Sequence, residues 1–193
     1  ENHQLGIFET GISKPGEMNL LADLIQPEFS IFTNLGAAHD EGFTSRTDKL
    51  EEKMHLLKNS STIFLLENDD SIQTAILEAC GDKKIIKSGH AKDAFLRTIA
   101  LTKEQEQTRF KFYFKDTEQE LLLPFIDDAS VNNVLYCILV YYYIRQSEPA
   151  TKICEELQSG LDNLRALAMR LEIIDGSYNS SIINDTYTND LDS

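Results

Sequence analysis

The chain has 193 residues, 41% of them hydrophobic and 26% charged, enough to bury the core of one domain and the start of another. Its formal net charge of −14 repels the nucleic-acid backbone and no basic patch offsets that charge, so we expect no nucleic-acid partner. No apolar run approaches the roughly 20 residues that cross a bilayer, and the polar start lacks the basic segment of a signal peptide.

The cysteines indicate the compartment. Cys80, Cys137 and Cys154 are odd in number, far apart in sequence and set in apolar helical stretches. This pattern is typical of reduced packing residues rather than of disulfides or metal ligands. We therefore expect a cytoplasmic protein without membrane insertion.

The first half of the sequence alternates short apolar runs with helical patterns. The runs predicted as strands are Leu5–Phe8, Phe29–Phe32, Thr62–Leu66 and Lys84–Lys87. Helices are predicted between them, around Met18 to Ile25, at Asp48–Lys58 and at Ser71–Cys80. Strands separated by helices of this length predict an α/β fold with a mostly parallel sheet flanked by helices.

The second half changes pattern. Alternating residues predict a small antiparallel β subdomain of three strands, at Phe95–Leu101, Arg109–Phe114 and Glu120–Leu123. Two helices follow, Val131–Arg145 and Pro149–Ser159, the second with Gly160 just past its end. Two further strands are predicted at Leu171–Ile174 and Ser181–Asn184. Both ends of the sequence look cut, so we expect an excerpt of a longer protein.

Polar residues follow the first two predicted strands, where open α/β sheets bind their ligands. Glu9 ends the first strand, and the run Thr33 to His39 follows the second. A carboxylate at a strand tip is a natural Mg²⁺ ligand when the metal also touches phosphate. A capping role for Glu9 and a structural hydrogen bond for His39 are the alternatives.

The segment from Gly11 to Met18 has the glycine spacing of a phosphate-binding loop. Glu17 and Met18 stand where such a loop needs lysine and serine or threonine. We therefore interpret this segment as a turn that leads into a helix.

Lys53 lies beside the apolar face of its predicted helix, which is defined by Leu50, Met54 and Leu57. It is expected to point inward or along the edge of that face, either as a snorkelling side chain or as a chemically used amine. The remaining charged positions are predicted to face solvent: Lys49, Glu51, Glu52, His55 and Lys58.

Several motifs together resemble the central domain of the Mur ligase family, over essentially the whole chain. They are Glu9 to Met18, Ile31 to Phe43, Lys53, Leu66 to Asp70, Asp127 to Asn133, Met169 to Glu172 and Ile183 to Asn189. The resemblance is to the branch that adds D-alanyl-D-alanine to the UDP-muramoyl tripeptide. The last three motifs are similar to the ligase/alanine-racemase fusion proteins. Each motif alone is weak, and their shared order carries the resemblance.

The resemblance implies a role for each matching position. Glu9 and His39 match Mg²⁺ ligands, and Lys53 matches a lysine that carbamylation converts into a metal ligand. Nucleotide contacts are implied for Asn133, Arg170 and Asp185. Ser130 and the run Thr188 to Asp190 depart from the family pattern, beside the adenine contact and at the hinge respectively.

The implied protein is an ATP- and Mg²⁺-dependent ligase of peptidoglycan precursor synthesis. It joins UDP-N-acetylmuramoyl-tripeptide to D-alanyl-D-alanine through an acyl-phosphate. Residues 1–175 would be a partial, truncated central domain without the phosphate loop, and 176–193 the hinge and start of a C-terminal domain. The fragment alone is expected to be inactive. The alternatives are a folylpolyglutamate-synthase-like ligase and a non-catalytic interaction module.

Overall fold

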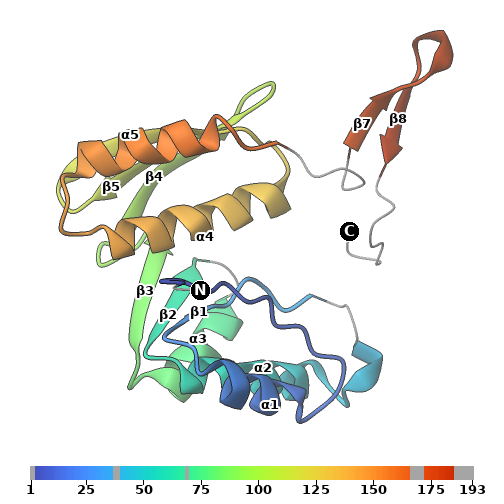
Figure 1. The fold of residues 1–193 in the computed structure, drawn as a ribbon, viewed down its shortest axis with the longest axis vertical. Helices are drawn as coiled ribbons and strands as arrows, with labels where there is room; N and C mark the ends of the chain where they lie inside the picture. Colours follow the sequence, from blue (N-terminus) through green and yellow to red (C-terminus); the bar gives the residue numbers. More distant parts are fainter. Residues whose placement is uncertain (1–2, 37–39, 68–69, 166–171, 185–193) are drawn as a thin grey trace. The chain divides into compact units, whose positions relative to one another are not determined.

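The computed structural model describes residues 3–36, 40–67, 70–165 and 172–184. Six strands form one mixed sheet in the order β1-β2-β3-β4-β5-β6 (Figure 1). They are β1 Phe29–Ile31, β2 Thr62–Leu66, β3 Lys84–Gly89, β4 Leu96–Lys103, β5 Thr108–Phe114 and β6 Thr117–Leu123. Together with the flanking helices, this sheet confirms the predicted α/β class.

Strand direction changes along the sheet. Lys84 N–H donates to the Ser61 carbonyl where β2 and β3 begin, and Glu67 N–H donates to the Ser88 carbonyl where they end, so the two strands are parallel. β3 and β4 are also parallel, whereas β4, β5 and β6 pair antiparallel. The antiparallel strands predicted as a small subdomain therefore continue the main sheet.

The helices are α1 Glu17–Ile25, α2 Arg46–Asn59, α3 Asp70–Cys80, α4 Asp128–Ile144 and α5 Ala150–Leu161, with a 3₁₀ turn, η1, at Asp40–Gly42. Ser45 and Asp127 cap α2 and α4, each by accepting a hydrogen bond from the backbone N–H three residues on, at 3.1 and 2.7 Å. α5 includes Gly160, which was predicted to lie past its end. Leu161, only 5% exposed, follows it in the last turn, and burial of that leucine outweighs the modest helical cost of glycine.

The predicted strand Leu5–Phe8 is wrong. The segment has no regular secondary structure, and the exposed fractions of Leu5, Ile7 and Phe8 are 65%, 89% and 65%. An apolar run forms a buried strand only where neighbouring strands and helices cover it, and no described element covers this one.

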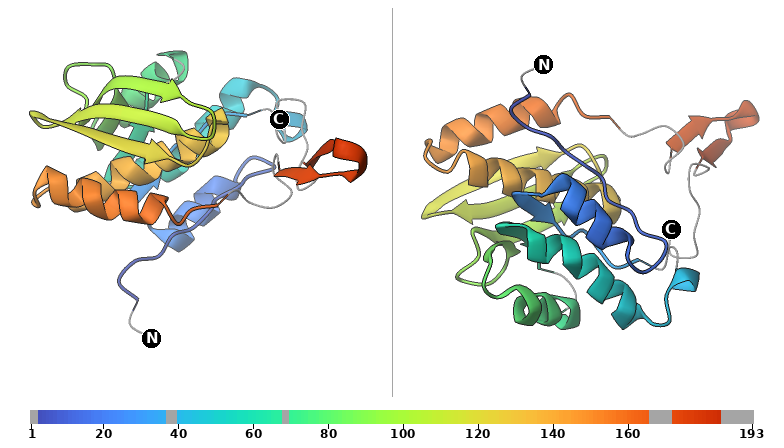
Figure 2. Two further views of the ribbon diagram at one scale, coloured as in Figure 1. Left: turned by 90° about the horizontal axis from the view of Figure 1, so that it is seen from above. Right: turned by 60° about the horizontal axis from the view of Figure 1, so that its bottom comes forward.

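The chain divides into two compact units. Unit 1 is Glu1–Ile63 with Asp69–Ile85, and it contains α1, α2, α3 and β1. Unit 2 is Phe64–Asn68 with Ile86–Ser193. In its core the Tyr142 ring of α4 packs edge-on against Phe112 and Phe114 of β5, with ring centroids 5.4 and 4.8 Å apart. α4 and α5 lie side by side along these strands (Figure 2).

Unit 2 also contains a two-stranded hairpin, β7 Glu172–Asp175 and β8 Ser181–Asn184, joined through a 3₁₀ turn, η2, at Ser177–Asn179. Both strands were predicted, apart from Leu171, which lies outside the described residues. Within the described ranges, none of the helices is both long and apolar enough to cross a membrane.

Candidate metal and nucleotide site

Glu9 lies in the extended segment that precedes α1. Its side chain is exposed, whereas Thr10 is half-buried and Ile12 is only 5% exposed. The chain is thus anchored three residues after the Glu9 carboxylate, which itself faces solvent.

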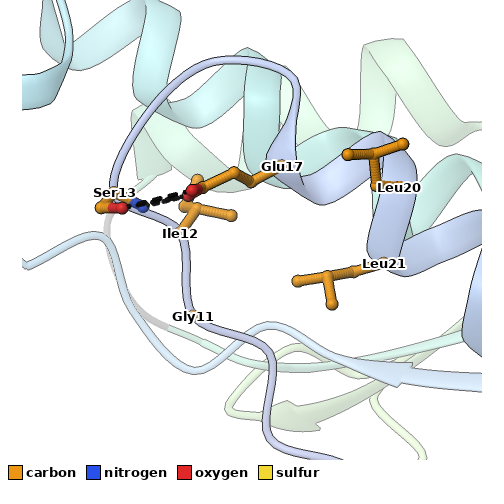
Figure 3. A pocket seen from close by; sticks show the side chains of 6 residues that line it. All are labelled: Gly11, Ile12, Ser13, Glu17, Leu20 and Leu21. Atoms are coloured by element: carbon orange, nitrogen blue, oxygen red, sulfur yellow. Dashed lines mark hydrogen bonds between the residues drawn. The ribbon is translucent and has the colours of Figure 1, made fainter.

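The loop from Gly11 to Gly16 uses its backbone donors on carboxylates of the same chain. The N–H groups of Ser13 and Lys14 donate to Glu17 Oε2, at 2.6 and 3.1 Å. The hydrogen bond from Ser13 and, to a lesser extent, that from Lys14 lower the pKa of the Glu17 carboxyl. Figure 3 shows Ser13 and Glu17 joined beside a pocket that is also lined by Gly11, Ile12, Leu20 and Leu21.

A second carboxylate reaches this loop from α2. Glu52 Oε1 accepts from the N–H groups of Gly16 and Met18, both at 2.9 Å, so it caps the start of α1 from another helix. Four backbone donors that a phosphate loop would offer to an anion are thereby occupied. This arrangement agrees with interpreting the segment as a turn.

The loop after β1 is held by three cationic side chains of α2. Lys53 Nζ donates to the Asn34 carbonyl at 3.3 Å, Arg46 Nη2 to that of Leu35 at 3.3 Å, and Lys49 Nζ to that of Gly36 at 2.5 Å. Three consecutive carbonyl oxygens thus each accept from a different residue of one helix.

Lys53 lies at the edge of the buried face, as predicted. Its side chain is half-buried, and its ammonium lies 5.9 Å from the centre of the Phe32 ring. Burial and, to a lesser extent, the neighbouring Lys49 ammonium lower the pKa of Lys53. A lowered pKa raises the fraction of neutral amine, which is the form that reacts with CO₂.

The predicted solvent positions of Lys49 and Glu52 are wrong. Their exposed fractions are 3% and 8%, whereas Glu51 and Lys58 are exposed and His55 is half-buried. The physical reason is that α2 contacts α1, α3 and β1, so it is covered on more than one side. The single apolar stripe in the sequence of α2 does not reveal this additional coverage.

The 3₁₀ turn η1 also touches the loop that precedes α1. A Cβ on Gly42 would overlap the Ser13 carbonyl oxygen and would lie 3.0 Å from its carbonyl carbon. Only glycine therefore fits at this approach, and the chain after Glu9 lies directly against the end of η1.

The nucleotide residues are placed only in part. Asn133 is exposed on α4, two turns after the Asp127 cap. His39, Arg170 and Asp185 lie outside the described residues. Glu9 and Lys53 belong to unit 1 and Asn133 to unit 2. The shared role of Glu9 and His39 as Mg²⁺ ligands therefore stays a prediction.

Mg²⁺ fits the implied ligands Glu9, His39 and Lys53 only if the amine of Lys53 is modified. In the part of the chain that the structure describes, no three His, Cys, Asp or Glu side chains gather closely enough to hold a metal. An ammonium on Lys53 would repel the ion, whereas a carbamate on the same nitrogen would supply oxygen ligands.

Comparison with known proteins decides the family. The family profile described as "Mur ligase middle domain" matches residues 1–141. The chain belongs to the Mur ligase family.

Several curated relatives of this Mur ligase chain carry the name UDP-N-acetylmuramoyl-tripeptide–D-alanyl-D-alanine ligase. The Bacillus subtilis protein is 27% identical over 97% of this chain and 39% of its own length. The Borreliella burgdorferi protein is 25% identical over 100% of this chain and 40% of its own length. The chain thus spans about two-fifths of the length of these relatives.

Solved structures share the fold. MurF from Acinetobacter baumannii has a TM-score of 0.74 at 18% identity, covering 93% of this chain and 38% of that one. MurF from Thermotoga maritima, in complex with ADP, has a TM-score of 0.67 at 18% identity, covering 92% and 39%. An L. casei FPGS reaches 0.64 at 18% identity, covering 94% and 43%, so fold alone does not separate the two ligase types.

Proposed function

We propose that the chain is the central part of a complete ligase that joins D-alanyl-D-alanine to UDP-N-acetylmuramoyl-tripeptide at the expense of ATP, in the cytoplasm. The observation that carries this proposal is the similarity to the Bacillus subtilis ligase along 97% of the chain. Residues 1–175 would then belong to the ATP-binding domain, and 176–193 to the hinge and the start of the C-terminal domain.

In this reaction the tripeptide carboxylate attacks the γ-phosphorus of ATP, and ADP leaves. The amine of D-alanyl-D-alanine then attacks the acyl-phosphate carbon, phosphate leaves, and the amine loses a proton. Glu9, His39 and Lys53 would hold Mg²⁺, which when bound neutralises phosphate charge. Asn133, Arg170 and Asp185 would contact the nucleotide. The residues described in unit 1 support the metal role of Lys53, because its amine is partly desolvated and its pKa is lowered.

The substrate assignment is tested by phosphate release from the purified complete ligase. Release should require ATP, UDP-N-acetylmuramoyl-tripeptide and D-alanyl-D-alanine together. Release that depends on a folate and glutamate instead would favour the FPGS-like alternative. A protein that releases no phosphate with either pair of substrates would contradict both ligase assignments and favour an interaction module.

The Lys53 assignment is tested separately in the complete ligase. Lys53→Ala should abolish most activity, and added short-chain carboxylates should restore part of it by occupying the vacated carbamate position. Lys58→Ala, on the exposed side of the same helix, is the control and should retain activity. Wild-type activity in Lys53→Ala would mean that Lys53 is only a snorkelling side chain.

A further inference from the structure

α2 carries two buried charges that bond to loops rather than to each other. Lys49 is 3% exposed and donates to the Gly36 carbonyl at 2.5 Å. Glu52 is 8% exposed and accepts from the Gly16 and Met18 N–H groups, both at 2.9 Å. One helix thus holds two loops through side chains of opposite charge.

Such burial is costly unless the charge is well bonded. A buried charge left without partners costs several kcal/mol or more. Apolar side chains at these two positions would pack α2 without that cost. Apart from the Met18 N–H in the first turn of α1, the bonded backbone groups belong to loops that lack regular structure. The buried charges therefore fix the conformation of these loops, which apolar side chains would not do.

Both loops adjoin residues of the proposed metal site. Glu9 lies two residues before Gly11, where the first loop begins. Lys53, the other proposed ligand in the described part of the site, donates to the Asn34 carbonyl of the second loop. The 3₁₀ turn η1, later in the chain than the second loop, meets the first loop where Gly42 approaches the Ser13 carbonyl. The backbone that follows Glu9 and the backbone that contacts Lys53 are therefore both fixed to α2, within a single compact unit.

We propose that Lys49 and Glu52 are positioning residues of the ligase, which fix the Glu9 loop and the Lys53 amine in the arrangement that binds the divalent cation. This inference rests on the proposed function. Neither residue touches substrate or metal in this role. Their effect passes through the loops 11–16 and 34–36.

The test measures metal affinity directly in the complete ligase, by titrating Mn²⁺ and following its electron paramagnetic resonance signal in the presence of ATP. Glu52→Gln and Lys49→Met should each weaken Mn²⁺ binding by about 10- to 100-fold, the usual effect of losing a residue that orients metal ligands. Glu51→Gln and Lys58→Met remove the same charges from exposed positions of α2 and should leave the affinity unchanged. Thermal unfolding of each variant identifies proteins that are merely unfolded.

Three results would decide the matter. Wild-type Mn²⁺ affinity in folded Glu52→Gln or Lys49→Met would overturn the inference for that residue. If both variants unfold, Glu52→Asp and Lys49→Arg keep the charge but change the reach, and wild-type affinity in both of these would overturn it equally. A wild-type enzyme that binds neither Mn²⁺ nor ATP would instead contradict the proposed function itself.

Discussion

At the scale of single residues, the position of Gly42 accepts no side chain, because the Ser13 carbonyl occupies the space that a Cβ would need. Gly42→Ala would push a methyl group into the Ser13 carbonyl and should destabilise the chain by about 1–3 kcal/mol, as overpacking usually does. Gly160→Ala is the matched control, because nothing lies within 4 Å of a Cβ there and the helix should gain about 0.5–1 kcal/mol. Urea unfolding of both variants measures the difference. An unchanged free energy of unfolding in Gly42→Ala would mean that η1 and the loop at Ser13 move apart without cost.

Glu148 gives a pH dependence of stability. Hydrogen bonds from Arg145, then from Lys152, lower the pKa of Glu148 to about 2. Since the folded-state pKa lies below the unfolded value of about 4.3, the contribution is complete above that value and is lost as pH falls toward 2. Glu148→Gln should therefore lower Tm at neutral pH, and its difference from wild type should shrink on acidification. Glu155→Gln, an exposed position on α5, is the control. A difference that stays constant with pH would contradict the assignment.

Residue-level prediction succeeded where one buried face decides the environment and failed where several elements converge. Lys53 was correctly predicted at the edge of its helix face because Leu50, Met54 and Leu57 define that face. Lys49 and Glu52 were wrongly predicted in solvent, because their partners are backbone groups of loops 13 to 36 residues away in sequence. No local pattern encodes such partners.

At the scale of elements, α5 closes the end of the sheet with a side chain. β6 is the last strand in the sheet order, and Gln158 bonds to the Leu122 backbone at both its N–H, 2.9 Å, and its carbonyl, 3.2 Å. The amide replaces a neighbouring strand at this position and so protects the edge from pairing with another chain.

Gln158→Ala removes both bonds to the Leu122 backbone and an exposed bond to Asp162, and it should cost about 1–2 kcal/mol and increase self-association. Gln158→Glu retains an acceptor for the Leu122 N–H but loses the donor for its carbonyl, so it should show an intermediate loss. Ser159→Ala, at an exposed neighbouring position, is the control. Chemical unfolding and light scattering provide the two measurements. Unchanged stability and a monomeric Gln158→Ala would show that the edge needs no such protection.

Whether a predicted strand formed also depended on whether neighbouring elements bury it. Thr62–Leu66 was predicted as a strand, and it is one, buried throughout its length. Leu5–Phe8 has a similar composition but is exposed, since composition shows that a run can be buried and not that a neighbour is present. The three antiparallel strands were recognised from their alternation, whereas their continuity with the parallel strands depends on the β3–β4 pairing, which spans the turn after Gly89.

At the scale of the whole molecule, several weak motifs were enough to predict the family, because they are spread along most of the chain in the order that the family has. The predicted metal and nucleotide residues remain proposals, since His39, Arg170 and Asp185 lie outside the described residues. Nucleotide affinity is also a property of the whole molecule. It depends on the net charge of the chain and on whether its backbone N–H groups are free to bind phosphate.

The 193-residue chain by itself should bind ATP only weakly. Its net charge is −14, and its sequence contains no Gly-Lys-Ser or Gly-Lys-Thr. Three N–H groups of the glycine loop and that of Met18 in α1 already donate to Glu17 and Glu52, so an approaching phosphate would meet two carboxylates at these donors. Calorimetry with ATP and Mg²⁺ should show no saturation at micromolar concentrations, whereas the complete ligase under the same conditions should bind. Submicromolar binding by the chain alone would mean that its described residues hold a phosphate site that neither the motif pattern nor the occupied loop reveals.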